Sequence, residues 1–164
     1  MTAETLPRSQ DWLPRPGTYA APPGRCVIEL TARFGPFVTL RRRLTLVSAV
    51  LTVTDEPRNS SLELHLTGGP LRQRALSFTG TDLTRRPADG PEATHLIAHG
   101  RLAVHRATVP AVWWLRIVRR TDNGLTVTGS TQVPCRDLRR SASLPLPRTR
   151  PADRLRLLVA AEFA

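Results

Sequence analysis

Lysine is absent from this chain of 164 residues, aromatic residues make up 5% of it, and cysteine occurs only twice. The longest apolar runs fall short of the 18 or more residues that a membrane-spanning helix needs, which argues against a helical membrane protein. Residues 1–17 contain three prolines and no apolar stretch typical of a secretory signal. We therefore expect a cytoplasmic protein.

The two cysteines give no sign of a metal or redox site. Cys26 and Cys135 are far apart in sequence, and the chain has no CxxC pair of the kind that binds zinc. A disulfide is not expected in a protein without a secretory signal. We expect both residues to be small core or edge residues, and we expect no cofactor.

All 24 basic residues are arginine, against 13 acidic residues, which gives a formal charge of +11. Two interpretations are open. The arginines could form a surface for nucleic acid or for anionic lipid headgroups. They could instead reflect a compositional bias, with the charges solvated. Arginine groups such as Arg41–Arg43, Arg85–Arg86 and Arg119–Arg120 are spread between the expected elements, which favours the second interpretation.

Apolar and polar residues alternate through most of the chain. A period of two places successive side chains on opposite faces of a β-strand. Many short strands in one chain favour an antiparallel sandwich or barrel. The expected strands are 17–21, 26–34, 44–54, 61–67, 95–106, 108–120, 125–133 and 154–163.

Other segments break this pattern. We expect residues 1–16 to be a flexible tail and residues 17–164 to be one domain, as the length suggests. Residues 37–43 could be a short helical or irregular crossing. Pro70 could begin a short helix that runs to about Phe78. Residues 122–124 predict a hairpin turn, and residues 139–153 read as a proline-bearing loop.

Three segments together resemble the YceI-like, or polyisoprenoid-binding, family. They are the entry 17–19, the strand 26–34, and residues 102–110, in which Thr108 and Pro110 match the family's "GVT-x-P" crossover. Residues 124–133 followed by Asp137 and Leu138 are similar to the family's penultimate strand and closing pair. The resemblance runs from about residue 17 to residue 164.

The resemblance implies a mainly β fold: a single antiparallel, lipocalin-like β-barrel of about eight strands with a short helical insertion between strands four and five. It also implies a hydrophobic interior that holds an isoprenoid or a fatty-acyl-like lipid, and barrels that can pair as a homodimer. Residues 71–83 depart from the family's usual charges in the insertion. Recognition of a head group there is therefore not carried over.

Strand parity, aligned with the family strands, predicts which side chains line the interior and contact the ligand. We expect the small residues among them to leave volume for it. The predicted lining residues are Ile28, Leu30, Ala32, Phe34, Leu64, Ala98, Gly100, Leu102, Val104, Trp113, Leu115, Ile117, Val127, Thr131 and Val133.

Strand geometry also decides two other patterns. Trp113 and Trp114 are neighbours, so one must face inward and the other outward; we expect Trp113 inside. His95 and His99 would lie about 13 Å apart on a strand, at about 3.3 Å per residue, which is too far for one metal ion. A phosphate site at residues 68–70, before the expected helix, is weaker than the interpretation of these residues as a simple turn.

No nucleophile elbow, HExxH motif or recognisable pair of catalytic carboxylates occurs, and we do not expect an enzyme. The sequence predicts a non-enzymatic carrier that holds an apolar chain-like ligand in its interior. The alternative is an interaction module whose arginine-rich surface binds nucleic acid, an acidic partner or an anionic membrane.

Overall fold

The computed structural model describes residues 12–67, 76–87, 94–104, 107–134, 136 and 154–164. These residues form nine β-strands and two short 3-10 turns, η1 (Pro23–Arg25) and η2 (Pro57–Asn59). The strands are β1 (Gly17–Ala20), β2 (Cys26–Phe34), β3 (Phe37–Val53), β4 (Ser61–Thr67), β5 (Leu76–Pro87), β6 (Thr94–Val104), β7 (Ala107–Thr121), β8 (Gly124–Pro134) and β9 (Arg154–Phe163). No helix among these residues is long and apolar enough to span a bilayer.

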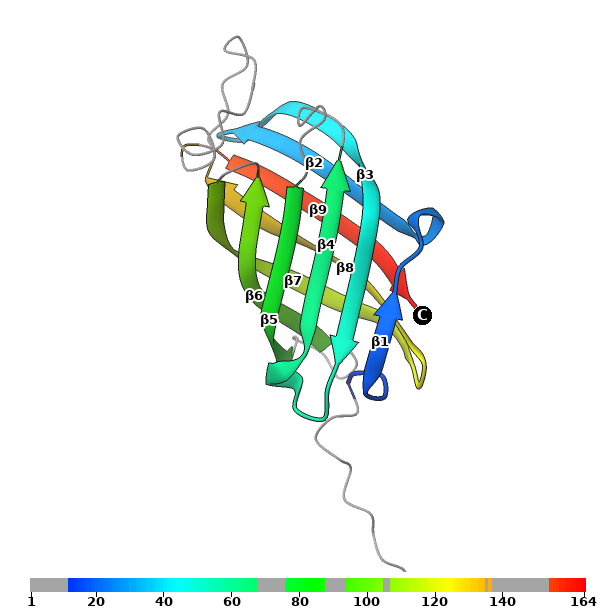
Figure 1. Ribbon diagram of the computed structural model, residues 1–164. Helices are drawn as coiled ribbons and strands as arrows, with labels where there is room; N and C mark the ends of the chain where they lie inside the picture. The colour runs from blue at the N-terminus through cyan, green and yellow to red at the C-terminus, as the bar shows by residue number, and fades with distance from the viewer. Residues whose placement is uncertain (1–11, 68–75, 88–93, 105–106, 135, 137–153) are drawn as a thin grey trace, which may run out of the picture.

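Eight of the strands close into an antiparallel barrel, as predicted (Figure 1). The order β3-β2-β9-β8-β7-β6-β5-β4 returns to β3 because β3 pairs with β4 as well as with β2. β9, the last strand along the chain, lies between β2 and β8. Closure leaves no long free edge, which is the usual solution for a sheet built from consecutive antiparallel strands.

β3 is 17 residues long and pairs with different barrel strands along its two halves. Its first half pairs with β2 and its second half pairs with β4, with Thr45 opposite Thr67. The ninth strand, β1, pairs with the last four residues of β3. Ala20 and Ala164 exchange two backbone hydrogen bonds of 3.2 and 3.1 Å, so β1 also connects β3 to the end of β9.

Two expectations of local structure are wrong. Residues 37–43 are not a crossing but the first part of β3, joined to β2 by a turn at Gly35 and Pro36. Gly35 has φ +57°, in the left-handed region that favours glycine. Residues 76–78, expected at the end of a helix, begin strand β5. The rest of that expected helix, and the loop 139–153, lie outside the described residues.

The strand β7 continues through Pro110. Pro110 is exposed and lies opposite Arg101 of β6. The pairing of β7 with β8 begins only at Trp114. Proline lacks an N–H, so it is tolerated where a strand has one hydrogen-bonded neighbour rather than two. The hairpin predicted at residues 122–124 is confirmed, with Thr121 opposite Gly124.

Residues that were expected to be a flexible tail pack at one end of the barrel, drawn at the bottom of Figure 1. Trp12 and Leu13 are buried. Arg120 Nε donates to the Leu13 carbonyl at 3.0 Å, and the Arg15 amide donates to the Asp122 carbonyl at 3.0 Å. The expectation is therefore wrong for residues 12–16; residues 1–11 lie outside the described part.

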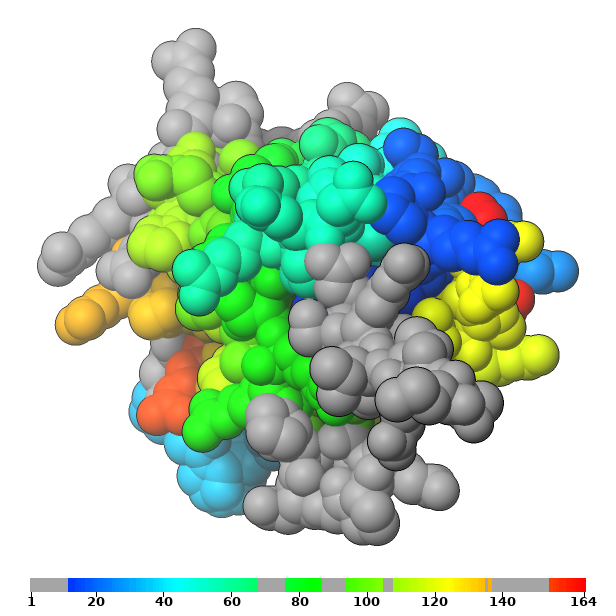
Figure 2. All heavy atoms as spheres, turned by 90° about the horizontal axis from the view of Figure 1, so that it is seen from below, coloured from blue at the N-terminus to red at the C-terminus, as the bar shows by residue number. Residues whose placement is uncertain are grey.

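The same contact is visible from below. In Figure 2 the blue atoms of the N-terminal segment lie against the yellow atoms around the β7–β8 turn. Tyr19 from β1 fixes this segment further, because its hydroxyl donates to the Arg15 carbonyl at 2.6 Å. We call this the closed end of the barrel.

Candidate ligand-binding site in the barrel interior

Most of the residues predicted to line the interior are buried there. Strand alternation explains the result, since each buried residue is followed by a more exposed neighbour along β4, along β9 and, from Leu125 onward, along β8. Gly100 and Ile117 are only partly buried. The buried members of the predicted set are Ile28, Leu30, Ala32, Leu64, Ala98, Leu102, Val104, Trp113, Leu115, Val127, Thr131 and Val133.

Phe34 is the exception, with half of its surface exposed. The register of β2 against β3 shifts between Ala32 and Arg33. The extra residue at this shift, Thr39, belongs to β3, and β2 stays in register with β9 up to Arg33. Phe34 is the last residue of β2 and lies beyond that ladder, next to the turn. The prediction that Phe34 lines the interior is therefore wrong.

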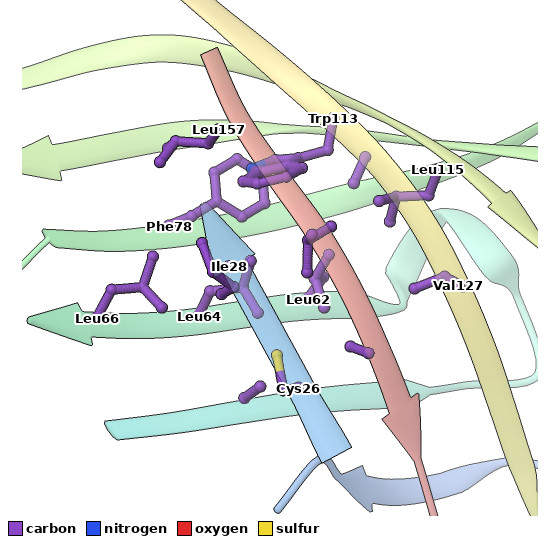
Figure 3. Close-up of a cluster of buried hydrophobic side chains, with 14 of the residues drawn as sticks. Cys26, Ile28, Leu62, Leu64, Leu66, Phe78, Trp113, Leu115, Val127 and Leu157 are labelled. Atoms are coloured by element: carbon purple, nitrogen blue, oxygen red, sulfur yellow. The ribbon is translucent and has the colours of Figure 1, made fainter. Parts of the chain in front are cut away.

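Two aromatic rings occupy the middle of the interior. Trp113 of β7 and Phe78 of β5 are both fully buried and meet edge to face, with ring centroids 5.9 Å apart and planes at 69°. Figure 3 shows this pair beside Ile28 and Leu157, with Leu62, Leu64 and Leu66 of β4 below. Edge-to-face packing is a favourable arrangement of aromatic rings. It defines an aromatic layer across the barrel.

Two glycines next to this layer leave space for the ring of Phe78. Gly80 and Gly100 lie opposite one another on β5 and β6. A Cβ atom on Gly80 would come within 2.9 Å of the Phe78 ring. One on Gly100 would meet the Thr79 carbonyl and lie 2.6 Å from the Gly80 Cα. Gly100 was expected to leave volume for a ligand; its missing side chain instead permits close approach of the two strands and of Phe78.

The interior contains two polar atoms without a hydrogen-bond partner among the described residues. They are the indole Nε1 of Trp113 and the hydroxyl Oγ1 of Thr131. Both residues are at least 98% buried. A buried polar group without a partner costs about 1–3 kcal/mol, so native proteins rarely keep one without a reason.

These two atoms come from neighbouring positions on adjacent strands. Trp114 and Ser130 are paired between β7 and β8. Trp113 and Thr131 are one position beyond the end of this ladder, and both side chains are buried. The two residues place an N–H donor and a hydroxyl inside an otherwise apolar wall. We call them the Trp113–Thr131 pair.

Sequence reasoning did not identify Arg42. It lies opposite Leu30 in the β2–β3 ladder, on the inward parity, yet its side chain is exposed. The ladder continues from Leu30 to Leu157 and from Leu157 to Thr131. Arg42 therefore stands on the same row of the barrel as the Trp113–Thr131 pair, at the end opposite the closed one. The exposure of an inward-facing residue depends on strand lengths, which alternation does not give.

Cys26 behaves as the core residue that was expected. It is buried and free, and burial raises the pKa of its thiol to about 11. A raised pKa keeps the thiol protonated and unreactive at neutral pH. Cys135 lies outside the described residues.

Trp113 and Trp114 face opposite sides of the barrel wall, as predicted. Trp113 is fully buried, whereas Trp114 is 45% exposed on the outer surface, where the guanidinium of Arg86 lies 5.5 Å from its ring centroid. His95 and His99 both belong to β6, as the strand prediction required. The described residues contain no group of three side chains that could hold a metal ion.

Comparison with known proteins gives no assignment for this chain. No protein-family model matches it, and no curated protein matches it. The resemblance to the YceI-like family therefore stays a prediction from sequence.

Proposed function

We propose that this protein binds an apolar chain-like molecule, such as an isoprenoid or a fatty-acyl lipid, in the barrel interior without transforming it. The observation that carries the proposal is the Trp113–Thr131 pair: two unpartnered polar atoms inside a wall of aliphatic side chains. An apolar chain that ends in an oxygen-bearing group would match both features.

Each part of the wall has a role in this proposal. Aliphatic side chains would contribute about 0.8 kcal/mol for each CH₂ group removed from water. The Trp113 N–H would donate to an oxygen of the ligand, and the Thr131 hydroxyl could donate or accept. Because Trp12 and Leu13 cover one end, the ligand would enter from the other, past Arg42.

The first experiment is mass spectrometry of the purified protein under native conditions, followed by analysis of its organic-solvent extract. A stoichiometric bound lipid supports the proposal and identifies its class. The protein would then be stripped and titrated with fatty acids and with isoprenoid alcohols. A protein that is purified empty and takes up neither class contradicts the proposal.

The substitution Thr131→Val separates ligand binding from simple packing. Valine keeps the shape of threonine but removes the hydroxyl. We expect the empty protein to become more stable by about 1 kcal/mol in urea unfolding, because an unpartnered buried hydroxyl is lost. We expect affinity for an oxygen-bearing ligand to fall about tenfold, the loss of one hydrogen bond in an apolar site.

Thr128→Val is the matched control. Thr128 is on the same strand but is exposed. It should change neither stability nor affinity. If Thr131→Val binds ligand as tightly as the unmodified protein, the Trp113–Thr131 pair is not the polar part of the site.

A further inference from the structure

The turn between β2 and β3 carries a concentration of exposed apolar side chains. Phe34 is 50% exposed, Phe37 is 71% exposed and Val38 is 49% exposed. Phe34 and Phe37 lie opposite one another across the turn at Gly35 and Pro36. They are two of the four phenylalanines in the chain. We call residues 34–38 the hairpin tip; it lies at the upper end of Figure 1.

Arginines surround the hairpin tip on three adjacent strands. Arg33 comes directly before it on β2, Arg41, Arg42 and Arg43 follow on β3, and Arg154 lies opposite Arg33 on β9. The last member is Arg156, opposite Thr31. We call these six residues the arginine cluster. Glu29 is the carboxylate that faces them from this part of the described sheet, and it pairs with Arg41 at 3.0 Å.

Two members of the arginine cluster have incomplete hydrogen bonding. The Nε atoms of Arg33 and Arg156 are buried and have no partner among the described residues. These residues are diagonal neighbours across β2 and β9, since Arg33 is opposite Arg154 and Thr31 is opposite Arg156. The guanidinium of Arg156 also donates to the Ser130 Oγ on β8 at 3.4 Å. Arginine side chains on neighbouring strands are suited to contact phosphate oxygens.

We propose that the hairpin tip and the arginine cluster dock the end of the barrel that carries the β2–β3 turn onto a bilayer that contains anionic phospholipid. The two phenylalanines and Val38 would enter the region between headgroups and acyl chains, and the arginines would contact lipid phosphates. Charge complementarity identifies the lipid as anionic. The exposed aliphatic Val38 beside the phenylalanines favours a bilayer over nucleic acid, whose phosphates and bases offer it no apolar surroundings.

This docking does not depend on the interior ligand. It rests on the hairpin tip and the arginine cluster, whereas the ligand proposal rests on side chains of the interior. If both hold, the barrel would present the end that carries the β2–β3 turn to the membrane.

The test is flotation of the protein with vesicles of phosphatidylcholine alone and with vesicles containing one quarter phosphatidylglycerol, in 0.1 M salt. We expect at least tenfold more binding to the anionic vesicles. Phe34→Ser with Phe37→Ser should lower that binding at least tenfold. Arg43→Gln with Arg154→Gln should lower it by about fivefold for each arginine removed.

The matched control is Val118→Ser with Arg119→Gln. Val118 is 59% exposed and Arg119 is exposed beside it, near the end of β7 that leads into the β7–β8 turn. The control removes the same kinds of group and should bind like the unmodified protein. All variants change exposed positions, and their folding would be checked by circular dichroism and urea unfolding.

A second measurement locates the contact. Tryptophan emission from Phe37→Trp should shift to the blue and be quenched by brominated lipid, whereas Val118→Trp should show neither change. Thr131→Val should bind vesicles normally whatever its effect on interior ligand.

Four results would overturn the docking proposal. They are equal binding to neutral and anionic vesicles, an unchanged Phe34 and Phe37 double variant, an equal loss in the Val118 and Arg119 control, or binding to single-stranded or duplex DNA with none to vesicles. The last result would identify the arginine cluster as a nucleic-acid surface.

Discussion

The two ends of the barrel differ in whether their large apolar side chains are buried or exposed. At the closed end Trp12 and Leu13 are buried, and backbone and side-chain hydrogen bonds join residues 12–16 to the β7–β8 turn. At the end that carries the β2–β3 turn, Phe34 and Phe37 are exposed and have arginines on either side in the sequence and on β9. Large apolar side chains thus stabilise one end and are offered to solvent at the other, so residue type alone does not distinguish a plug from a contact surface.

The sharpest contrast should come from truncating one aromatic side chain at each end. Trp12→Ala should lower the free energy of unfolding by about 3–5 kcal/mol, as expected for a buried tryptophan. Phe37→Ala should change it by no more than about 0.5 kcal/mol, since the side chain is exposed. Urea unfolding of both variants measures the difference. Equal losses of stability would mean that the Phe37 side chain contributes as much to folding as that of Trp12.

The wall between the ends should be intolerant of even one methyl group at Gly100. Gly100→Ala would push a Cβ against the Thr79 carbonyl and the Phe78 ring, and we expect it to destabilise the barrel by about 1–3 kcal/mol. Gly24→Ala is the matched control, because nothing lies within 4 Å of a Cβ there. If the two alanine variants are equally stable, the strands around Phe78 can separate at little cost.

A smaller effect should appear in alkaline solution. Below pH 9 the Cys26 thiol is protonated in both states; between pH 9 and about 11 it ionises in the unfolded chain but stays protonated in the folded one. Stability should therefore fall with rising pH by up to about 1.4 kcal/mol per unit in that window. Cys26→Ala should lose this slope. Unfolding midpoints at pH 8 to 11 under reducing conditions measure this slope. If the unmodified protein and Cys26→Ala show the same pH dependence, folding does not raise the pKa of the thiol.

Much of the fold could be predicted because alternation is a local signal. The barrel and the inward parity of residues such as Ile28, Leu64 and Trp113 follow from it. Phe34 could not be placed, because its exposure depends on how far β2 extends past its neighbour β9, which alternation does not give. Trp12 and Leu13 stand among prolines without any period, and only tertiary packing buries them. The Trp113–Thr131 pair needed the register between β7 and β8, which no single strand contains.

The position of β9 has a consequence for the folding of the nascent chain. β2 and β8 acquire their shared neighbour only when residues 154–163 have been made. Until then a nascent chain has an open sheet with two unsatisfied edges, and such edges invite pairing with other chains. Premature termination anywhere in β9 would therefore yield an aggregation-prone sheet rather than a weakened barrel.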